Sequence, residues 1–309
     1  MQPSISSARM STKPFLKWVG GKTQILEEVL RLFPATMENY HEPFVGGGGV
    51  LLGLLGAVAE GKITITGKVF ASDLNPTLIG LYKNVQARPT ELVAAVKLLA
   101  DEFALCTGAV VNRKPTTVEE ARTSAESYYY WIRSRFNTAG LDKTSVEASA
   151  MFLFLNKTCF RGLWREGPHG FNVPCGHYAN PTILDEAHIL AVSTLIKDVI
   201  FACQPFTAAF TEVVPQDFIY LDPPYAPETA TSFVGYTTEG FNITMHNTLF
   251  RLTKEMKSRA VRILMSNADV ALVKDAFPAG AYQTKIVNCR RAINSKKPES
   301  QTNELLISG

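Results

Sequence analysis

Four consecutive glycines at positions 46–49 follow the segment Glu42-Pro43-Phe44-Val45 and precede an apolar stretch that begins at Val50. The next strand pattern, over residues 68–73, ends in an acid. A strand, a glycine loop, a helix and a second strand with a terminal acid form a mononucleotide-type unit, whose ligands bind beyond the carboxyl ends of parallel strands. In isolation, a glycine turn beside a helix N-cap accounts for the same residues equally well. The wider pattern favours an α/β protein.

Strand and helix patterns alternate at both ends of the chain, whereas the region between them carries helical patterns alone. Helical spacing is found over residues 22–33, 91–106, 118–137 and 146–158. Strand patterns cover residues 199–203 and 218–221, and the alternating closing segments 283–289 and 303–308 predict an antiparallel hairpin. We therefore expect a leader over residues 1–12, a sheet domain formed by residues 13–75 and 189–309, and an inserted helical domain over residues 76–188.

The composition is that of a globular chain, with 46% hydrophobic and 19% charged residues among 309. The formal net charge of +3 permits a polyanionic partner without requiring one. The cysteines are scattered and form no Cys-x-x-Cys pair, and the five histidines have no ligand spacing, so we expect reduced thiols and no metal site. Without a long apolar segment or a secretion signal, the chain is expected to be soluble and intracellular, in the cytoplasm.

Asp222-Pro223-Pro224-Tyr225 directly follows the apolar run Phe218-Ile219-Tyr220-Leu221, so a carboxylate, a proline carbonyl and an aromatic ring are expected at the tip of a buried strand. The two prolines remove backbone donors and fix φ, which leaves nearby carbonyls as acceptors. This arrangement predicts a pocket for an extruded purine whose amino group the acceptors hold. The same dipeptides occur in ordinary surface turns, so the motif alone leaves both interpretations open.

Two common nucleotide motifs are excluded by their spacing. The glycine run does not satisfy Gly-x-Gly-x-x-Gly, since counting from Gly46 places Leu51 at the last position, and this disfavours NAD. Gly20-Gly21-Lys22-Thr23 lacks the earlier glycine of a phosphate loop, because Leu16 stands there, and this disfavours an ATPase.

The same region nevertheless offers groups that suit an adenosyl ligand. Asp73 is placed for ribose hydroxyls, as the acid of a mononucleotide unit is. Trp18 provides a stacking face, and Lys22 provides a cation for a carboxylate on the ligand. Core packing and surface charge are the alternative roles of Trp18 and Lys22.

The motifs follow one another as Pro14-Phe15-Leu16-Lys17-Trp18-Val19-Gly20-Gly21-Lys22, Glu42-Pro43-Phe44-Val45-Gly46-Gly47-Gly48, Ser72-Asp73-Leu74-Asn75 and Asp222-Pro223-Pro224-Tyr225. In this order the chain closely resembles the Dam-type DNA adenine-N6 methyltransferases, the D12 class. Shorter matches, among them Arg161-Gly162-Leu163 and Leu264-Met265-Ser266-Asn267, extend the resemblance over nearly the whole span 14–307.

The resemblance implies a Rossmann-like methyltransferase sheet that uses S-adenosylmethionine and no metal, with the helical insert as the DNA target-recognition domain. The implied cofactor-binding residues are Trp18, Lys22, Phe44, Gly46, Gly48, Asp73 and Asp222. The implied catalytic residues are Asp222, Pro223, Pro224 and Tyr225, beside which the extruded adenine enters. The expected reaction is attack of the adenine amine on the sulfonium methyl, with the amine hydrogen-bonded to Asp222 and the Pro223 carbonyl.

The resemblance also implies a DNA-reading loop, where cations and aromatic residues are interleaved. The implied DNA-binding residues are Lys17, Phe160, Arg161, Leu163 and Arg165, with Phe160 as a wedge into the base stack and Arg165 as a base reader. Arg161 stands where Dam-type proteins carry Asn, so GATC and other short palindromes both remain open as the target. A capped helix end with aromatic side chains in the core is the alternative. Tyr128-Tyr129-Tyr130 is predicted to face the core.

These features predict a site-specific adenine-N6 methyltransferase of double-stranded DNA. We expect a monomer without a membrane partner, and a cognate restriction endonuclease remains open. The basic pairs Arg290-Arg291 and Lys296-Lys297 either clamp phosphates or are solvated. Methylation of RNA and a catalytically silent DNA-binding regulator are the rival functions. The aromatic and basic loop disfavours the first, and the intact Asp222 to Tyr225 motif disfavours the second.

Overall fold

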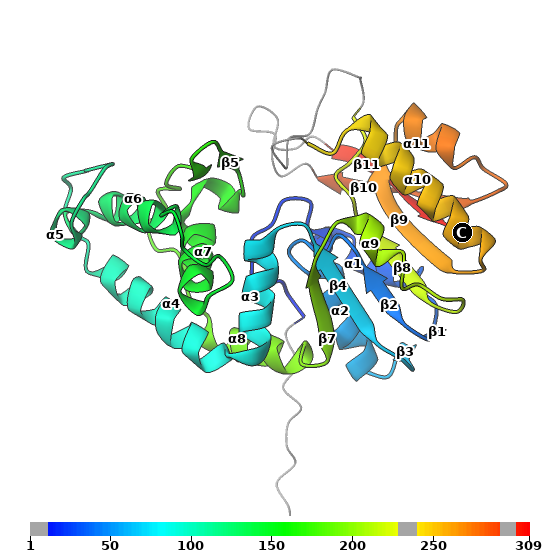
Figure 1. Ribbon diagram of the computed structural model, residues 1–309, viewed down its shortest axis with the longest axis horizontal. Helices are drawn as coiled ribbons and strands as arrows, with labels where there is room; N and C mark the ends of the chain where they lie inside the picture. Colours follow the sequence, from blue (N-terminus) through cyan, green and yellow to red (C-terminus); the bar gives the residue numbers. More distant parts are fainter. Residues whose placement is uncertain (1–11, 228–239, 291–300) are drawn as a thin grey trace, which may run out of the picture.

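A seven-stranded sheet with the strand order β10-β11-β9-β8-β2-β4-β7 organises the computed structural model, which describes residues 12–227, 240–290 and 301–309 (Figure 1). Its strands are β2 (Tyr40–Glu42), β4 (Val69–Asp73), β7 (Val199–Cys203), β8 (Phe218–Leu221), β9 (Arg262–Ala268), β10 (Gln283–Arg290) and β11 (Gln301–Ser308). The five neighbouring strands β9, β8, β2, β4 and β7 are parallel to one another. β11 pairs antiparallel with both β9 and β10. The mostly parallel α/β sheet and its closing hairpin are therefore confirmed.

Both faces of the sheet are covered, as β8 shows. Phe218 and Tyr220 belong to one buried cluster, and Ile219 and Leu221 belong to the other. A strand buried on both faces has a continuous apolar sequence, which explains the run before Asp222. The first face is packed by η1 (Lys22–Gln24), α1 (Leu26–Leu30) and α2 (Gly49–Ala59), and the second by α10 (Ile243–Ser258) and α11 (Ala271–Ala276). The short α9 (Phe206–Ala209) follows β7, and β1 (Thr36–Met37) pairs with β3 (Thr64–Ile65) in a separate ribbon.

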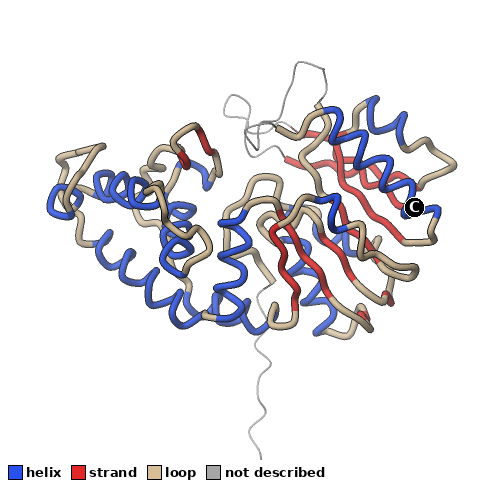
Figure 2. Tube along the Cα trace, in the orientation of Figure 1, coloured by secondary structure: helices blue, strands red, loops and turns tan. Residues whose placement is uncertain are grey.

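Helices dominate the region between β4 and β7 and lie beside the sheet (Figure 2). They are α3 (Pro76–Ala87), α4 (Pro89–Ala104), α5 (Val118–Ala121), α6 (Ala125–Phe136), α7 (Val146–Thr158), η2 (Phe160–Gly162) and α8 (Glu186–Leu195). Figure 1 shows α3 between the sheet and the other helices, and α3 contacts β4 and β7 as well as α7 and α8. Tyr128 and Tyr129 of α6 are fully buried, as predicted, whereas Tyr130 is half-buried and packs against the edge of the same core.

Two local features of this region differ from the prediction. The helix expected over residues 118–137 is divided, because the Ser124 hydroxyl accepts a hydrogen bond from the Ser127 N–H at 3.1 Å and starts a new helix. A small hairpin of β5 (Glu166–Gly167) and β6 (Gly170–Phe171) also follows η2, where no strand pattern was recognised. Two paired residues a side are too short to produce a period-2 pattern.

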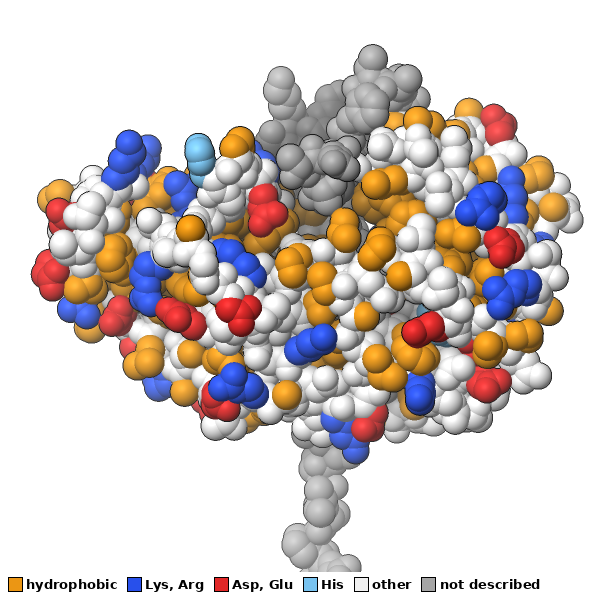
Figure 3. Space-filling model, viewed as in Figure 1, with side chains coloured by type: hydrophobic (Ala, Val, Ile, Leu, Met, Phe, Trp, Pro, Cys, Tyr) orange, Lys and Arg blue, Asp and Glu red, His pale blue; other side chains and the backbone are white. Residues whose placement is uncertain are grey.

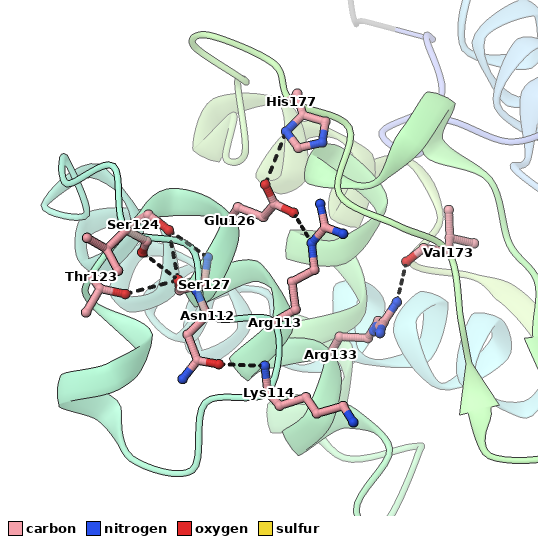
Figure 4. A network of polar contacts seen from close by, with 11 residues as sticks. Asn112, Arg113, Lys114, Thr123, Ser124, Glu126, Ser127, Arg133, Val173 and His177 are labelled. Carbon is pink, nitrogen blue, oxygen red and sulfur yellow. Dashed lines mark hydrogen bonds and ion pairs between the residues drawn. The ribbon is translucent and has the colours of Figure 1, made fainter.

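A polar network fixes two loops of the insert onto α6 (Figure 4). The Glu126 carboxylate lies 2.8 Å from Arg113 Nε and 3.7 Å from His177 Nδ1. Arg133 Nη1 donates to the Val173 carbonyl at 3.1 Å. The segment that follows the β5–β6 hairpin is thereby held on the helical core of the insert.

A buried carboxylate joins β2 to β8 at the amino ends of these strands. Asp217 is 0% exposed and accepts hydrogen bonds from the Asn39 N–H at 3.1 Å, Asn39 Nδ2 at 2.8 Å and the Val214 N–H at 3.0 Å. His41 Nε2 lies 2.8 Å from its second oxygen. Burial lowers the pKa of His41, although the Asp217 carboxylate opposes that shift.

The two strands joined in this way flank the switch point of the sheet. From β2 the chain runs outward to β4 and β7, and then returns to β8 on the other side of β2. In open α/β sheets, ligands bind in the crevice beyond the carboxyl ends of the strands at such a point. Glu42 is the last residue of β2, the glycine run follows this strand, and Asp222 follows β8, so the motifs of the sequence meet there.

The leader predicted over residues 1–12 lies outside the described residues, except for Thr12, and so do Arg291, Lys296 and Lys297. Within the described ranges, no helix is long and apolar enough to cross a bilayer.

Candidate active site

Lys22 and Asp222 form an ion pair at the switch point. Lys22 Nζ lies 2.7 Å from Asp222 Oδ2, with the two side chains 3% and 19% exposed. Lys22 Nζ also donates to the Gly20 carbonyl at 2.8 Å and lies 5.1 Å from the Tyr225 ring centroid. Lys22, which was predicted to bind a carboxylate of the ligand, is therefore paired with Asp222 in this structure. Its role toward a ligand stays a prediction.

Two further acids share this corner because of strand alternation. Tyr40, Tyr220 and Leu306 face the same cluster, and side chains two residues away along a strand point to the same face. Glu42 and Glu304 stand in this relation to Tyr40 and Leu306. Glu304 Oε2 lies 4.0 Å from Lys22 Nζ, and Glu42 Oε2 accepts a hydrogen bond from the Tyr40 hydroxyl at 2.7 Å.

The corner is rich in acid relative to its single lysine. Burial raises the pKa of Glu42 to about 8, and the nearby Asp222 adds to that rise. Burial also raises the pKa of Asp222 to about 6, with Lys22 opposing the shift and Glu304 supporting it. At neutral pH Glu42 is therefore mostly protonated, and Asp222 and Glu304 share the one ammonium, which leaves the site receptive to a second positive charge.

Several polar atoms beside this corner have no hydrogen-bond partner within the described part of the chain. They are Asn267 Nδ2, the Tyr225 hydroxyl and Glu304 Oε2, all buried. The Tyr225 hydroxyl and the Glu304 carboxylate interact with each other without forming a well-aligned hydrogen bond, and Glu304 Oε2 lies 4.0 Å from Lys22 Nζ. Asn267 Oδ1 accepts from the Ala226 N–H at 3.0 Å, which places this amide next to the Asp222 to Tyr225 segment. Buried polar groups are rarely left unpaired, so this set indicates a site that a polar ligand completes.

The glycine loop is pinned by Asp73 and packed by two aromatic side chains. Asp73 accepts hydrogen bonds from the Gly46 N–H at 3.1 Å and the Asn75 N–H at 3.0 Å, and burial raises its pKa. Gly46 and Gly48 have φ of +48° and +71°. A Cβ on Gly46 would lie 3.1 Å from Trp18 Cδ1, and one on Gly48 would lie 2.5 Å from the Tyr82 hydroxyl. In this structure, the groups that approach the glycine backbone closely are therefore the side chains of Trp18 and Tyr82.

Phe44 lies beside the loop and belongs to an aromatic cluster at the carboxyl end of β7. Its ring stacks on Phe206 with centroids 5.5 Å apart and meets Phe241 edge to face at 6.0 Å. Phe44 is half-buried, so one part of the ring remains accessible at the edge where the loop begins.

The predicted DNA-reading loop follows α7 and is largely exposed. Phe160 is 44% exposed, and the Arg161 guanidinium lies 5.2 Å from its ring centroid. Arg165 is exposed, and its Nε donates to Asn172 Oδ1 at 2.6 Å. Leu163 is half-buried and packs against the hydrophobic core instead of projecting from it. The structure thus presents Phe160, Arg161 and Arg165 to solvent together.

Lys17 lies next to this loop although it comes from the other end of the chain. Its Nζ lies 4.4 Å from the Tyr178 ring centroid, and its backbone N–H and carbonyl are hydrogen-bonded to the Asn156 side chain. Trp18 stacks on Trp164 with ring centroids 6.4 Å apart. Trp18 therefore lies between the glycine loop and the DNA-reading loop.

The face drawn in Figure 3 carries Lys and Arg side chains interspersed with Asp and Glu side chains. On this face no broad surface of one sign is present, so attraction of a polyanion depends on local groups. Among the described residues no cluster of metal-binding side chains is found, and the four cysteines described there, Cys106, Cys159, Cys175 and Cys203, are free.

Residues 18–293 match the family model described as D12 class N6 adenine-specific DNA methyltransferase. The chain belongs to this family, and its activity is methylation of adenine N6 in DNA. It is 36% identical over 308 residues to the type II methyltransferase M.MjaIII of Methanocaldococcus jannaschii, covering 96% of this chain and 99% of that protein. It is 30% identical over 285 residues to the DNA adenine methylase of Escherichia coli K12, covering 92% and 90% of the two chains.

Three residues at this corner and loop had no role assigned from the sequence. Glu42 stands inside a quoted motif, Asn156 lies just before the predicted DNA-reading loop, and Glu304 reaches the site through the pairing of β11 with β9. The signal for Glu304 was an acid two residues before Leu306, and therefore on the same face of the alternating closing segment. No local signal indicated the partner of Trp164.

Proposed function

We propose that the corner formed by Asp222, Pro223, Pro224 and Tyr225 is the catalytic site of a site-specific, adenine-specific DNA methyltransferase. The observation that carries this proposal is the buried Lys22 to Asp222 pair at the switch point of the sheet. The Asp222 carboxylate and the Pro223 carbonyl accept hydrogen bonds from the exocyclic amine of an extruded adenine. These bonds favour a pyramidal nitrogen, whose lone pair is then free to react.

S-adenosylmethionine supplies the methyl group on a sulfonium centre. Its site is formed by Trp18, Lys22, Phe44, Gly46, Gly48, Asp73 and Asp222. The acid-rich corner supports this assignment, because Asp222 and Glu304 share one lysine and so favour a cationic ligand. The buried hydroxyl, amide and carboxylate atoms that have no hydrogen bond within the described residues offer hydrogen bonds to a polar ligand. No metal is required for the transfer.

Tyr225 stacks on the extruded adenine. A base on an aromatic ring is stabilised by about 1–3 kcal/mol, which is comparable to the cost of unstacking the base from the duplex. Phe160 acts as the wedge that fills the space left in the stack, in keeping with its exposure.

The helical region 76–188 is the DNA target-recognition domain, and residues 13–75 with 189–309 are the catalytic domain. Lys17, Phe160, Arg161, Leu163 and Arg165 contact the duplex. The target is a short palindrome, for which GATC is one candidate. The protein acts as a monomer in the cytoplasm, with or without a cognate restriction endonuclease.

Arg161 distinguishes this loop from that of Dam-type proteins. Its φ of +57° lies in the left-handed region, which Asn adopts more readily than Arg. Dam-type proteins carry Asn at this position, so this chain presents a longer, charged donor there. The resemblance therefore does not fix the target of this chain, and GATC and other short palindromes are both candidates.

Replacing Arg165 with alanine is expected to relax one position of the recognition site by about 1–3 kcal/mol of discrimination. In the free protein the guanidinium is held by Asn172, which pre-orients it toward a bidentate partner. Methylation rates on duplexes with one changed base pair give the result. If Arg165→Ala and the wild type discriminate equally at every position, Arg165 does not read a base.

The rate of methyl transfer is expected to fall as the pH drops below about 6, because burial raises the pKa of Asp222 to about 6 and only the ionised carboxylate accepts hydrogen bonds on both oxygens as a charged acceptor. Lys22→Met removes the group that lowers this pKa, so the acid limb moves to higher pH. The profile of kcat/KM reports ionisations of the free enzyme and is the quantity to measure. Lys97→Met, at a 60% exposed lysine on α4, is the control and leaves the limb unchanged. If the acid limb of Lys22→Met lies at the same pH as that of the wild type, ionisation of Asp222 does not cause this limb.

The target and the modified base are tested together by single-molecule sequencing of DNA from a methylation-free host that expresses this chain. N6-methyladenine in one short palindromic context is the expected result. Modification in no fixed context would contradict the proposed site specificity.

A further inference from the structure

Asn156, near the end of α7, binds the backbone of Lys17 through both ends of its amide. The Lys17 N–H donates to Asn156 Oδ1 at 2.9 Å, and Asn156 Nδ2 donates to the Lys17 carbonyl at 2.7 Å. The same Nδ2 lies 3.4 Å from the Gly162 carbonyl, and Asn156 is only 3% exposed. One buried amide therefore joins α7, the N-terminal segment and the DNA-reading loop.

Gly162 gives this junction its close contact. Its φ is +64°, and a Cβ there would lie 2.4 Å from Lys17 Cβ and 2.9 Å from Lys17 Cδ. The stem of the Lys17 side chain thus runs directly over the Gly162 backbone. Any larger residue at position 162 must push Lys17 away from the loop.

Trp18 extends the junction to the glycine loop. Its ring stacks on Trp164 at 6.4 Å with an interplanar angle of 26°. On its other side, a Cβ on Gly47 would lie 2.6 Å from Trp18 Cβ. A shift of the backbone at Lys17 and Trp18 therefore moves a predicted base-contacting group and a predicted cofactor-binding ring together.

We propose that Asn156 and Gly162 are positioning residues that hold Lys17 and Trp18 against loop 160–165, so that base reading and cofactor placement depend on one junction. The inference rests on the roles proposed above for Lys17 and Trp18. Neither positioning residue touches the reacting atoms. Their effect arises because small displacements of groups around a reacting centre have large effects on rate.

Asn156→Ala is expected to raise the KM for S-adenosylmethionine and to lower discrimination between the cognate duplex and singly altered duplexes, each by about tenfold. The kcat at saturating cofactor and cognate duplex changes less. The matched control is Asn84→Ala. Asn84 is 7% exposed in α3 and donates to the Thr144 carbonyl and Ser149 Oγ, both at 2.8 Å, without contacting residue 17. Its loss is expected to lower stability alone. Equal KM and discrimination in the two variants would reduce Asn156 to a structural role.

Gly162→Ala tests the same junction from the other side. Gly140→Ala is its control, because Gly140 has a similar φ of +82° but nothing within 4 Å of the added Cβ. Both variants carry the backbone strain of a left-handed alanine, and only Gly162→Ala displaces Lys17. We expect Gly162→Ala to reproduce the higher KM and weaker discrimination of Asn156→Ala. If the two glycine variants behave alike, the proposed junction is wrong.

Asp222→Ala separates this inference from the proposed function. If the junction variants match their controls while Asp222→Ala abolishes transfer, only the junction fails. If Asp222→Ala retains transfer, the proposed catalytic site fails, whatever the junction variants show.

Discussion

Asp222→Ala is expected to lower the rate of methyl transfer by about 10³-fold or more while leaving affinity for duplex DNA within about threefold. The carboxylate is the charged acceptor for the adenine amine, and its removal also leaves buried Lys22 without its partner at 2.7 Å. Contacts to DNA phosphates dominate the affinity for duplex DNA, and a carboxylate such as Asp222 does not make them. Single-turnover transfer of labelled methyl and equilibrium binding of one duplex measure the two quantities separately.

Two further variants make this experiment specific. Asp222→Asn keeps the volume of the side chain and removes its charge, so a comparable loss of rate identifies the carboxylate as the cause. Asp101→Ala removes an acid that is 62% exposed on α4 and should leave the rate unchanged. A rate for Asp222→Ala within tenfold of the wild type would contradict the catalytic assignment.

Asp217→Ala is expected to lower the free energy of unfolding by about 3–5 kcal/mol. Asp217 is fully buried and accepts from two backbone N–H groups, the Asn39 amide and His41. Alanine leaves the buried His41, the partly buried Asn39 and the Val214 N–H without this acceptor. Because Asp217 joins β2 to β8, the loss weakens the sheet at the two strands that carry the active site. Denaturant unfolding followed by circular dichroism gives the free energy.

Asp198→Ala is the matched control for this change. Asp198 is 87% exposed and lies 3.8 Å from Lys197, so its removal should change the free energy of unfolding by less than about 0.5 kcal/mol. A loss below about 1 kcal/mol in Asp217→Ala would show that the donors around Asp217 find other partners.

Much of the sheet was predictable, because its strands carry local signals. The apolar run before Asp222 coincides with β8, and the alternating closing segments form β10 and β11. The acid corner was also partly within reach, since period-2 alternation alone places Glu42 with Tyr40 and Glu304 with Leu306. The alternation pattern does not give the order of the strands, and it is this order that makes β2 and β8 neighbours.

Contacts between distant segments were beyond reach of the sequence. Lys22 meets Asp222, and Trp18 meets Trp164, only through the packing of elements that no spacing rule connects. The division of the helix after residue 121 was a different kind of miss. Ser124 is a recognisable N-cap, but the apolar spacing that continues across it outweighed the signal.

The central claim is that the amine of an extruded adenine binds at Asp222, beyond the carboxyl ends of β2 and β8. A crystal structure of the protein with its cognate duplex and S-adenosylhomocysteine tests it most directly. The account predicts adenine N6 within about 2.7–3.2 Å of an Asp222 oxygen, with the base on the Tyr225 ring. An adenine that remains stacked in the duplex, or that lies in a pocket away from Asp222, would contradict it.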